Sequence, residues 1–262
     1  MWVDGHVGGE SERIIGEWML GWRRSSLTIA TKVGKLPGVR GLAPDVVRRA
    51  IDASLERLGM DYVDIYYAHA DDPDVPLETV VRAFDGLVRE GLVRRVGLSN
   101  FTADRVREWL DISDREGLVA PSVLQPHYNL VFRKEFESGL REVALEMGLI
   151  AMPYFGLASG FLTGKYRTAA NLAGRAREVM AGRYLNAQAW SLLDEVVRIA
   201  GVHQVEPATV ALAWLLAQPT VFAPIASVSH AAQLPAMMAA RLLTLSEEEA
   251  VALGLGSARV EA

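Results

Sequence analysis

The amino-acid sequence predicts an α/β fold with a parallel sheet, a (β/α)8 barrel of the TIM type. Apolar runs of strand length alternate with segments of helical periodicity, and the strand ends recur every 26 to 37 residues. Polar or reactive side chains stand at these ends, where barrels of this type carry their sites. The strand ends are Lys32, His69, Ser99, Gln125 and Tyr154.

A doubly wound open sheet is the competing parallel fold. Its dinucleotide-binding form carries a glycine fingerprint after the first strand, with an acidic residue about twenty positions later. No strand in this sequence is followed by that pattern. The barrel is therefore the preferred architecture.

Six strands are predicted from β-branched and aromatic runs that end at turn-forming or polar residues. They are Ser26–Thr31, Val63–Ala68, Val93–Leu98, Ser122–Pro126, Leu149–Tyr154 and Val221–Ser227. A closed barrel of this type has eight strands. The first two strands are thus expected to be missing, which would leave two unpaired sheet edges and favour self-association.

Helices are predicted where apolar residues recur at helical spacing between capping residues and glycines. Ser11 before an acidic first turn and Pro44 in a first turn are two such start signals. The segments are Arg13–Leu20, Pro44–Gly59, Val80–Val88, Thr102–Ile112, Phe136–Met147, Trp190–Ala200, Pro207–Leu216, 231–240 and 246–254. Residues 165–189 lack periodicity and are expected to form a long surface loop.

Composition narrows the class of protein. The 262 residues are half apolar and contain no linker-like stretch, so one domain over 1–262 is expected. A net charge of -5 argues against nucleic acid and anionic membranes as partners. The chain has no cysteine, no apolar run long enough for a membrane span and no signal-peptide pattern, which predicts a cytoplasmic protein. Arginine outnumbers lysine 23 to 4, so each lysine is a candidate for a special role.

Six ordered motifs resemble those of the aldo-keto reductases, from about residue 2 to the C-terminal helices. The motifs are Thr28–Lys32, Asp64–His69, Val96–Phe101, Leu124–Leu130, Ser159–Tyr166 and Ala223–Ser227. The resemblance implies a barrel that binds NADPH and moves a hydride to the carbonyl carbon of an aldehyde or ketone. NADH is the alternative cofactor, and the implied partner is a small-molecule carbonyl substrate.

The resemblance also implies roles for individual residues. Lys32 corresponds to the lysine that lowers the pKa of the catalytic tyrosine, and His69 to the histidine that orients the carbonyl oxygen. The other counterparts bind the cofactor. Ser99, Asn100 and Gln125 would hydrogen-bond the nicotinamide carboxamide, Tyr154 would stack on its ring, Leu157, Ser159 and Gly160 would follow the pyrophosphate, and Ser227 and Gln233 would lie near the adenosine.

The catalytic aspartate and tyrosine of the family have no counterpart in this sequence. Trp2–Gly5 already matches the loop that follows that tyrosine, so the resemblance implies an N-terminally truncated barrel. An aldehyde or ketone reductase and a nucleotide-binding or regulatory relative without turnover are both compatible with these motifs. A third alternative is a metal-dependent hydrolase that uses His69 with Asp71, Asp72 and Asp74.

Overall fold

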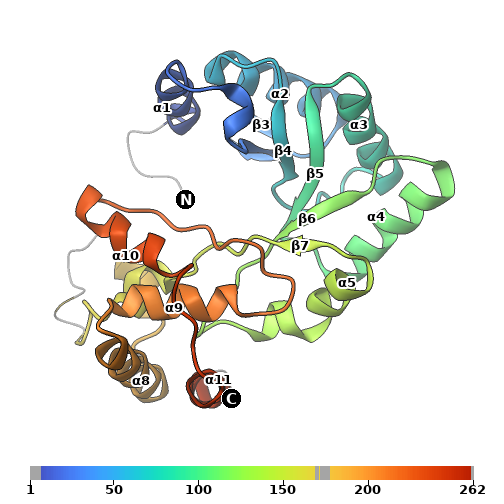
Figure 1. Cartoon of the computed structure of the whole chain (residues 1–262). Coiled ribbons are helices and arrows are strands. Elements are labelled where there is room, and N and C mark those ends of the chain that lie inside the picture. Colours follow the sequence, from blue (N-terminus) through green and yellow to red (C-terminus); the bar gives the residue numbers. More distant parts are fainter. Residues whose placement is uncertain (1–6, 169–170, 172–177, 261–262) are drawn as a thin grey trace. The chain divides into compact units, whose positions relative to one another are not determined.

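The computed structural model describes residues 7–168, 171 and 178–260. Its contacts divide into two compact units, Met1–Leu124 and Gln125–Ala262. The segment Trp2–Gly5, which the sequence analysis matched to a loop, lies outside the described residues. Figure 1 shows the course of the chain through both units.

The first unit is built on parallel strands. Hydrogen bonds join them in the order β1-β4-β5-β6, and both β1 with β4 and β4 with β5 pair in parallel. These strands are β1 (Ala30–Val33), β4 (Val63–Ala68), β5 (Val93–Ser99) and β6 (Pro121–Gln125). The α/β class and the parallel arrangement predicted from the sequence are confirmed.

Helices alternate with these strands, as Figure 1 shows in blue to green. They are α1 (Glu10–Met19), α2 (Pro44–Leu58), α3 (Leu77–Arg89) and α4 (Ala103–Glu116). Thr102 caps α4 by accepting a hydrogen bond from the Arg105 backbone N–H at 3.3 Å, and Gly117 ends it in the left-handed conformation. The apolar stripes of α2, α3 and α4 are buried, which is the amphipathic pattern expected for crossover helices.

Strand β1 begins later than predicted. The segment before it holds a short 3-10 turn, η1 (Arg24–Ser26), and the Ile29 backbone N–H donates to the Asp64 carboxylate at 2.8 Å. Arg24 donates to the same carboxylate at 2.7 Å. This side-chain anchor takes the place of a ladder hydrogen bond from the Ile29 N–H, so the first residues of Ser26–Thr31 are wrongly assigned to the strand. The loop beyond β1 also contains a small hairpin, β2 (Lys35–Leu36) with β3 (Val39–Arg40).

The second unit is mainly helical around a large apolar core. Its elements are η2 (Phe136–Leu140), α5 (Arg141–Glu146), β7 (Ile150–Ala151), η3 (Ala158–Thr163), α7 (Glu178–Gly182), α8 (Ala187–His203), α9 (Pro207–Leu216), η4 (Ala231–Gln233), α10 (Leu234–Ala239) and α11 (Glu247–Val260). Parallel bridges join His127 with Tyr154 and Ala151 with Val221. The predicted helix Phe136–Met147 is two segments, because Ser138 and Gly139 leave the helical conformation.

The predicted sixth strand, Val221–Ser227, is wrong as a continuous strand. Val221 forms one bridge, and the N–H groups of Phe222 and Ile225 donate to Ala151 and Pro153 at 2.9 and 2.7 Å. Pro224 between them has no N–H to contribute to a ladder. Within the described ranges, β1 has only β4 as a strand neighbour, and the strands do not close into a barrel.

The described part of the region 165–189 is not an exposed surface loop as predicted. Tyr166, Ala181 and Tyr184 are buried, and the short helix α7 lies within the region. Among the described residues, no single helix is long and apolar enough to cross a membrane. Only α8 and α9 counted together, across a bend of 98°, meet the length and composition required.

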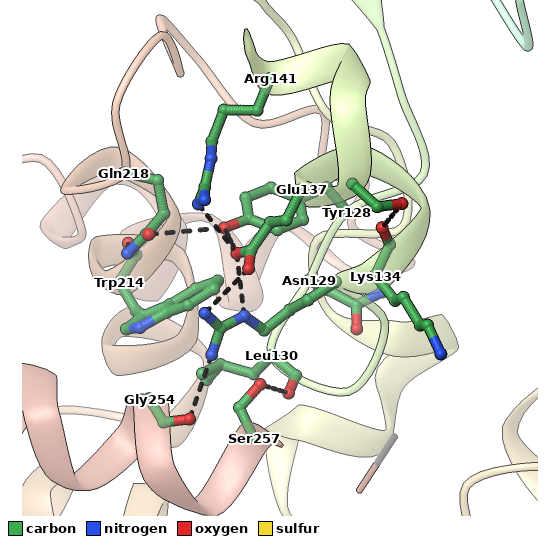
Figure 2. A network of polar contacts seen from close by, with 12 residues as sticks. Tyr128, Asn129, Leu130, Lys134, Glu137, Arg141, Trp214, Gln218, Gly254 and Ser257 are labelled. Atoms are coloured by element: carbon green, nitrogen blue, oxygen red, sulfur yellow. Dashed lines mark hydrogen bonds and ion pairs between the residues drawn. The ribbon is translucent and has the colours of Figure 1, made fainter. Parts of the chain in front are cut away.

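A polar network fixes the second unit around Glu137 (Figure 2). Arg133 binds this carboxylate at 2.9 and 3.0 Å, and the buried Tyr128 hydroxyl donates to it at 2.6 Å. Arg133 also donates to the Gly254 carbonyl at 3.1 Å, while the Ser257 hydroxyl donates to the Leu130 carbonyl at 2.6 Å. The network therefore ties α11 to the segment that precedes η2.

Substitution in this network separates two contributions to stability. Tyr128→Phe removes the hydroxyl that lies 2.6 Å from Glu137 and 3.4 Å from Gln218, and is expected to lower the free energy of unfolding by about 1 kcal/mol. Glu137→Gln removes the charge that pairs with Arg133 and is expected to cost more, about 2–3 kcal/mol. Urea unfolding monitored by circular dichroism measures both. Equal losses would show that pairing with Arg133 adds nothing to stability.

A close contact in the first unit gives a second test. A Cβ on Gly97 of β5 would lie 2.4 Å from the buried Tyr67 ring, so Gly97→Ala is expected to destabilise by about 1–3 kcal/mol. Gly86 in α3 is the matched control, because a Cβ there meets nothing within 4 Å. Gly86→Ala should stabilise by about 0.5–1 kcal/mol in the same urea assay. A tolerated Gly97→Ala would contradict the tight Tyr67 packing.

Candidate functional site

Three adjacent strands of the first unit bring four predicted site residues to one end of their sheet. The parallel register aligns Lys32 with Tyr67 and Tyr67 with Gly97. His69 and Ser99 each follow two positions later, on the same face, because side chains alternate along a strand. Lys32, His69 and Ser99 therefore gather at the carboxyl ends of β1, β4 and β5. Asn100 is the next residue after Ser99.

Burial sets the electrostatics of this group of residues. It lowers the pKa of the Lys32 ammonium, whose Nζ lies 5.5 Å from the centre of the Tyr67 ring. Burial, reinforced by the positive charges of Lys32 and Lys35, lowers the pKa of His69 to about 4. The His69 imidazole is thus neutral at pH 7 and carries one N–H donor.

Asn100 holds the turn after His69. Its side-chain amide donates to the His69 carbonyl at 2.7 Å and to the Ser99 hydroxyl at 3.1 Å. Its backbone φ of 56° lies in the left-handed region, which asparagine tolerates better than most residues. Ser99 itself is almost fully buried. The amide therefore fixes how the ends of β4 and β5 lie side by side.

The acidic loop after His69 has structural partners. The Asp71 carboxylate binds the Arg105 guanidinium at 2.8 and 2.9 Å, and Asp72 accepts from the Leu42 backbone N–H at 2.6 Å. Among the described residues, no group of three or more histidine and acidic side chains is arranged to hold a metal ion. The loop carboxylates thus stabilise local structure, and nothing in their arrangement favours the metal-hydrolase alternative.

In the second unit, Gln125 and Tyr154 lie on adjacent segments of the chain. Gln125 is buried as the last residue of β6, and the Tyr154 N–H donates to the following Pro126 carbonyl at 2.9 Å. The Tyr154 ring stacks on His127, with centroids 5.2 Å apart and planes 21° apart. His127 stacks in turn on Phe132 at 3.9 Å and 13°. The rings of His127 and Phe132 thus support the predicted stacking residue.

The segment from Phe155 to Gly160 has an unusual backbone. Phe155, Ala158 and Ser159 all have positive φ values, and Gly160 follows at 94°. Such strain in non-glycine residues is concentrated at functional segments. Leu157 is partly buried against the apolar core, whereas Ser159 and Gly160 are buried in η3.

Ser227 and Gln233 lie in exposed segments of the second unit. The Gln233 side-chain oxygen accepts from the Ser229 backbone N–H at 2.9 Å and its hydroxyl at 3.3 Å, so it closes the turn before η4. That oxygen is used within the fold, and the amide NH2 is the group left to meet a ligand. No described contact brings Ser227 to Gln233.

Two residues with functional potential were not predicted as site residues. Lys165 lies beside Gly160, where an added Cβ would come within 3.1 Å of its Nζ. The scarcity of lysine was the signal that could have identified it. His127 supports Tyr154, and burial followed by the charge of Arg183 lowers its pKa to about 4. The Leu124–Leu130 motif contains His127, but the sequence does not indicate that its ring stacks on Tyr154.

The lowered pKa values predict loss of stability in acid. Unfolded histidine titrates near 6.5, whereas folded His69 and His127 titrate near 4. The unfolded chain therefore binds more protons in this range, and stability is lost as the pH falls from about 6.5 to about 4. His127→Phe keeps an aromatic stack and removes one titrating group, so its unfolding midpoint in urea should fall less between pH 7 and pH 5. A fall as large as that of the original chain would mean that His127 contributes nothing to acid sensitivity.

Comparison with known proteins identifies a family. The model of the Aldo/keto reductase family matches residues 7–253. An aldo-keto reductase of Strobilurus tenacellus is 33% identical over 96% of this chain and 75% of its own length. A putative voltage-gated potassium channel subunit beta of Schizosaccharomyces pombe is 35% identical over 86% of this chain and 70% of its own length.

A solved structure extends the likeness to three dimensions. A thermostable aldo-keto reductase in complex with the inhibitor epalrestat aligns with a TM-score of 0.77 and 28% identity, covering 95% of this chain and 78% of that one. The family model matches most of the sequence, relatives share more than 30% identity with it, and the solved structure has the same fold. The chain belongs to the aldo-keto reductase family.

Proposed function

We propose that this chain binds NADPH and reduces the carbonyl group of a small aldehyde or ketone to an alcohol. The observation that carries the proposal is the meeting of Lys32, His69 and Ser99 at the ends of adjacent parallel strands, on one face. Family membership supports an oxidoreductase. The preference for NADPH over NADH rests on the resemblance of the motifs.

The donor set fits a nicotinamide nucleotide. Amides and a hydroxyl, from Gln125, Asn100 and Ser99, suit the donors and acceptors of a carboxamide. The Tyr154 ring suits stacking on a planar heterocycle. Small, strained residues of η3 beside the Lys165 ammonium suit a phosphate group, since backbone N–H groups and a point charge are common phosphate ligands. Ser227 and Gln233 complete the proposed set at the adenosine end.

The nucleotide supplies the hydride when it is bound. The neutral His69 would donate a hydrogen bond to the carbonyl oxygen, and the Lys32 ammonium would stabilise the negative charge that develops there. In the first unit, Tyr67 presents its ring face to Lys32, and the Tyr62 ring lies between the guanidinium groups of Arg24 and Arg94 at 4.0 and 3.9 Å.

A nucleotide-binding or regulatory role without turnover is the second candidate. The names of two relatives favour it: a putative voltage-gated potassium channel subunit beta of Schizosaccharomyces pombe and a probable one of Arabidopsis thaliana. Both candidates retain the predicted cytoplasmic location, the lack of nucleic-acid and membrane partners, and self-association through an unpaired strand edge.

One experiment tests the proposal and separates the candidates. NADPH fluorescence is followed as purified chain is added, and 4-nitrobenzaldehyde is then supplied while NADPH oxidation is recorded. Binding with turnover supports the reductase. Binding without turnover favours the regulatory candidate, and an absence of binding would overturn both.

Tyr154 provides a residue-level test of nucleotide binding. Tyr154→Ala removes the stacking surface and should weaken NADPH binding about fivefold to tenfold, in line with roughly 1 kcal/mol for an aromatic stack. Tyr154→Phe keeps the ring and should bind as the original chain does. The dissociation constants come from the same fluorescence titration. Equal affinity of the Ala and Phe variants would remove Tyr154 from the proposed site.

A further inference from the structure

We propose that Lys32 captures aldehydes covalently as a reversible imine, an activity separate from the reduction proposed above. All four lysines of the sequence lie in the described part of the chain. Lys35, Lys134 and Lys165 are exposed, whereas Lys32 is partly buried at the end of β1. Its surroundings therefore differ from those of every other lysine.

The contacts of Lys32 raise the share of neutral amine above that of an exposed lysine. Within the described ranges, no carboxylate lies within 4.0 Å of its Nζ, and its nearest recorded partner is the face of the Tyr67 ring. His69, at the end of the neighbouring strand, is neutral at pH 7 and carries no negative charge that could stabilise an ammonium. Partial burial without an anion disfavours the ammonium form, which is the physical basis of its lowered pKa. A larger share of Lys32 than of an exposed lysine is then nucleophilic.

The chemistry needs no cofactor and no change of oxidation state. The Nζ lone pair attacks the carbonyl carbon, and one N–H proton moves to the carbonyl oxygen to give a carbinolamine. Loss of that hydroxyl with the remaining N–H proton releases one water and leaves a C=N bond. The neutral His69 imidazole, which follows the end of the neighbouring strand, would relay these protons.

Reductive trapping tests this proposal on the complete chain. The chain is incubated at pH 7.5 with 4-nitrobenzaldehyde and cyanoborohydride, without nucleotide, and then digested for mass spectrometry. Fragmentation of the peptides separates Lys32 from Lys35, three positions away. Lys32 is expected to be labelled about tenfold faster than Lys35. Labelling of Lys32 at or below the rate of Lys35 would overturn the proposal.

Two variants sharpen the result. Lys32→Arg keeps the positive charge but cannot form a neutral amine, so fast labelling should disappear and only the slow amines should react. Lys35→Arg is the matched control in the exposed hairpin and should keep the fast reaction. If Lys32→Arg fails to fold, the comparison of Lys32 with Lys35 in the original chain decides by itself. Because nucleotide is left out, failure of imine formation and failure of NADPH binding are distinguishable.

Discussion

The packing of the Tyr67 ring against Gly97 is the constraint on which the first unit depends. A side chain at position 97 would occupy the space of that ring, so β4 and β5 come together in this way only because β5 carries a glycine there. The same register sets Lys32 beside Tyr67. It also decides which residues emerge two positions later, so that His69 and Ser99 share a face. A shift by one residue would turn these side chains to the opposite face.

Much of the first unit follows from local sequence. Continuous apolar runs bounded by polar residues mark buried parallel strands, and glycines after amphipathic stretches mark helix ends. These signals located β4, β5 and their helices. The start of β1 was missed because the Asp64 carboxylate, far along the chain, takes the Ile29 N–H. Likewise Val221–Ser227 has strand composition, but the missing N–H of Pro224 breaks its ladder.

The same distinction applies to the site. The places of Lys32, His69, Ser99 and Gln125 at or next to strand ends could be predicted, whereas Tyr154 lies three residues beyond the end of β7. The support of Tyr154 by His127 and Phe132 could not be predicted, because stacking depends on how separate segments pack in three dimensions. The hydrogen bond from the Ser229 N–H to the Gln233 side-chain oxygen could not be predicted either, because it depends on the local backbone geometry and not on residue type.

Helix α11 bears on where this domain can be cut. The family match stops at residue 253, yet the helix continues to Val260. Two hydrogen bonds drawn in Figure 2 involve residues of that extension. The Gly254 carbonyl accepts from Arg133, and the Ser257 hydroxyl donates to the Leu130 carbonyl. An expression boundary chosen at the end of the sequence match would remove the hydrogen bonds from Arg133 to the Gly254 carbonyl and from Ser257 to the Leu130 carbonyl. The end of the family match is therefore not the end of the folded unit here.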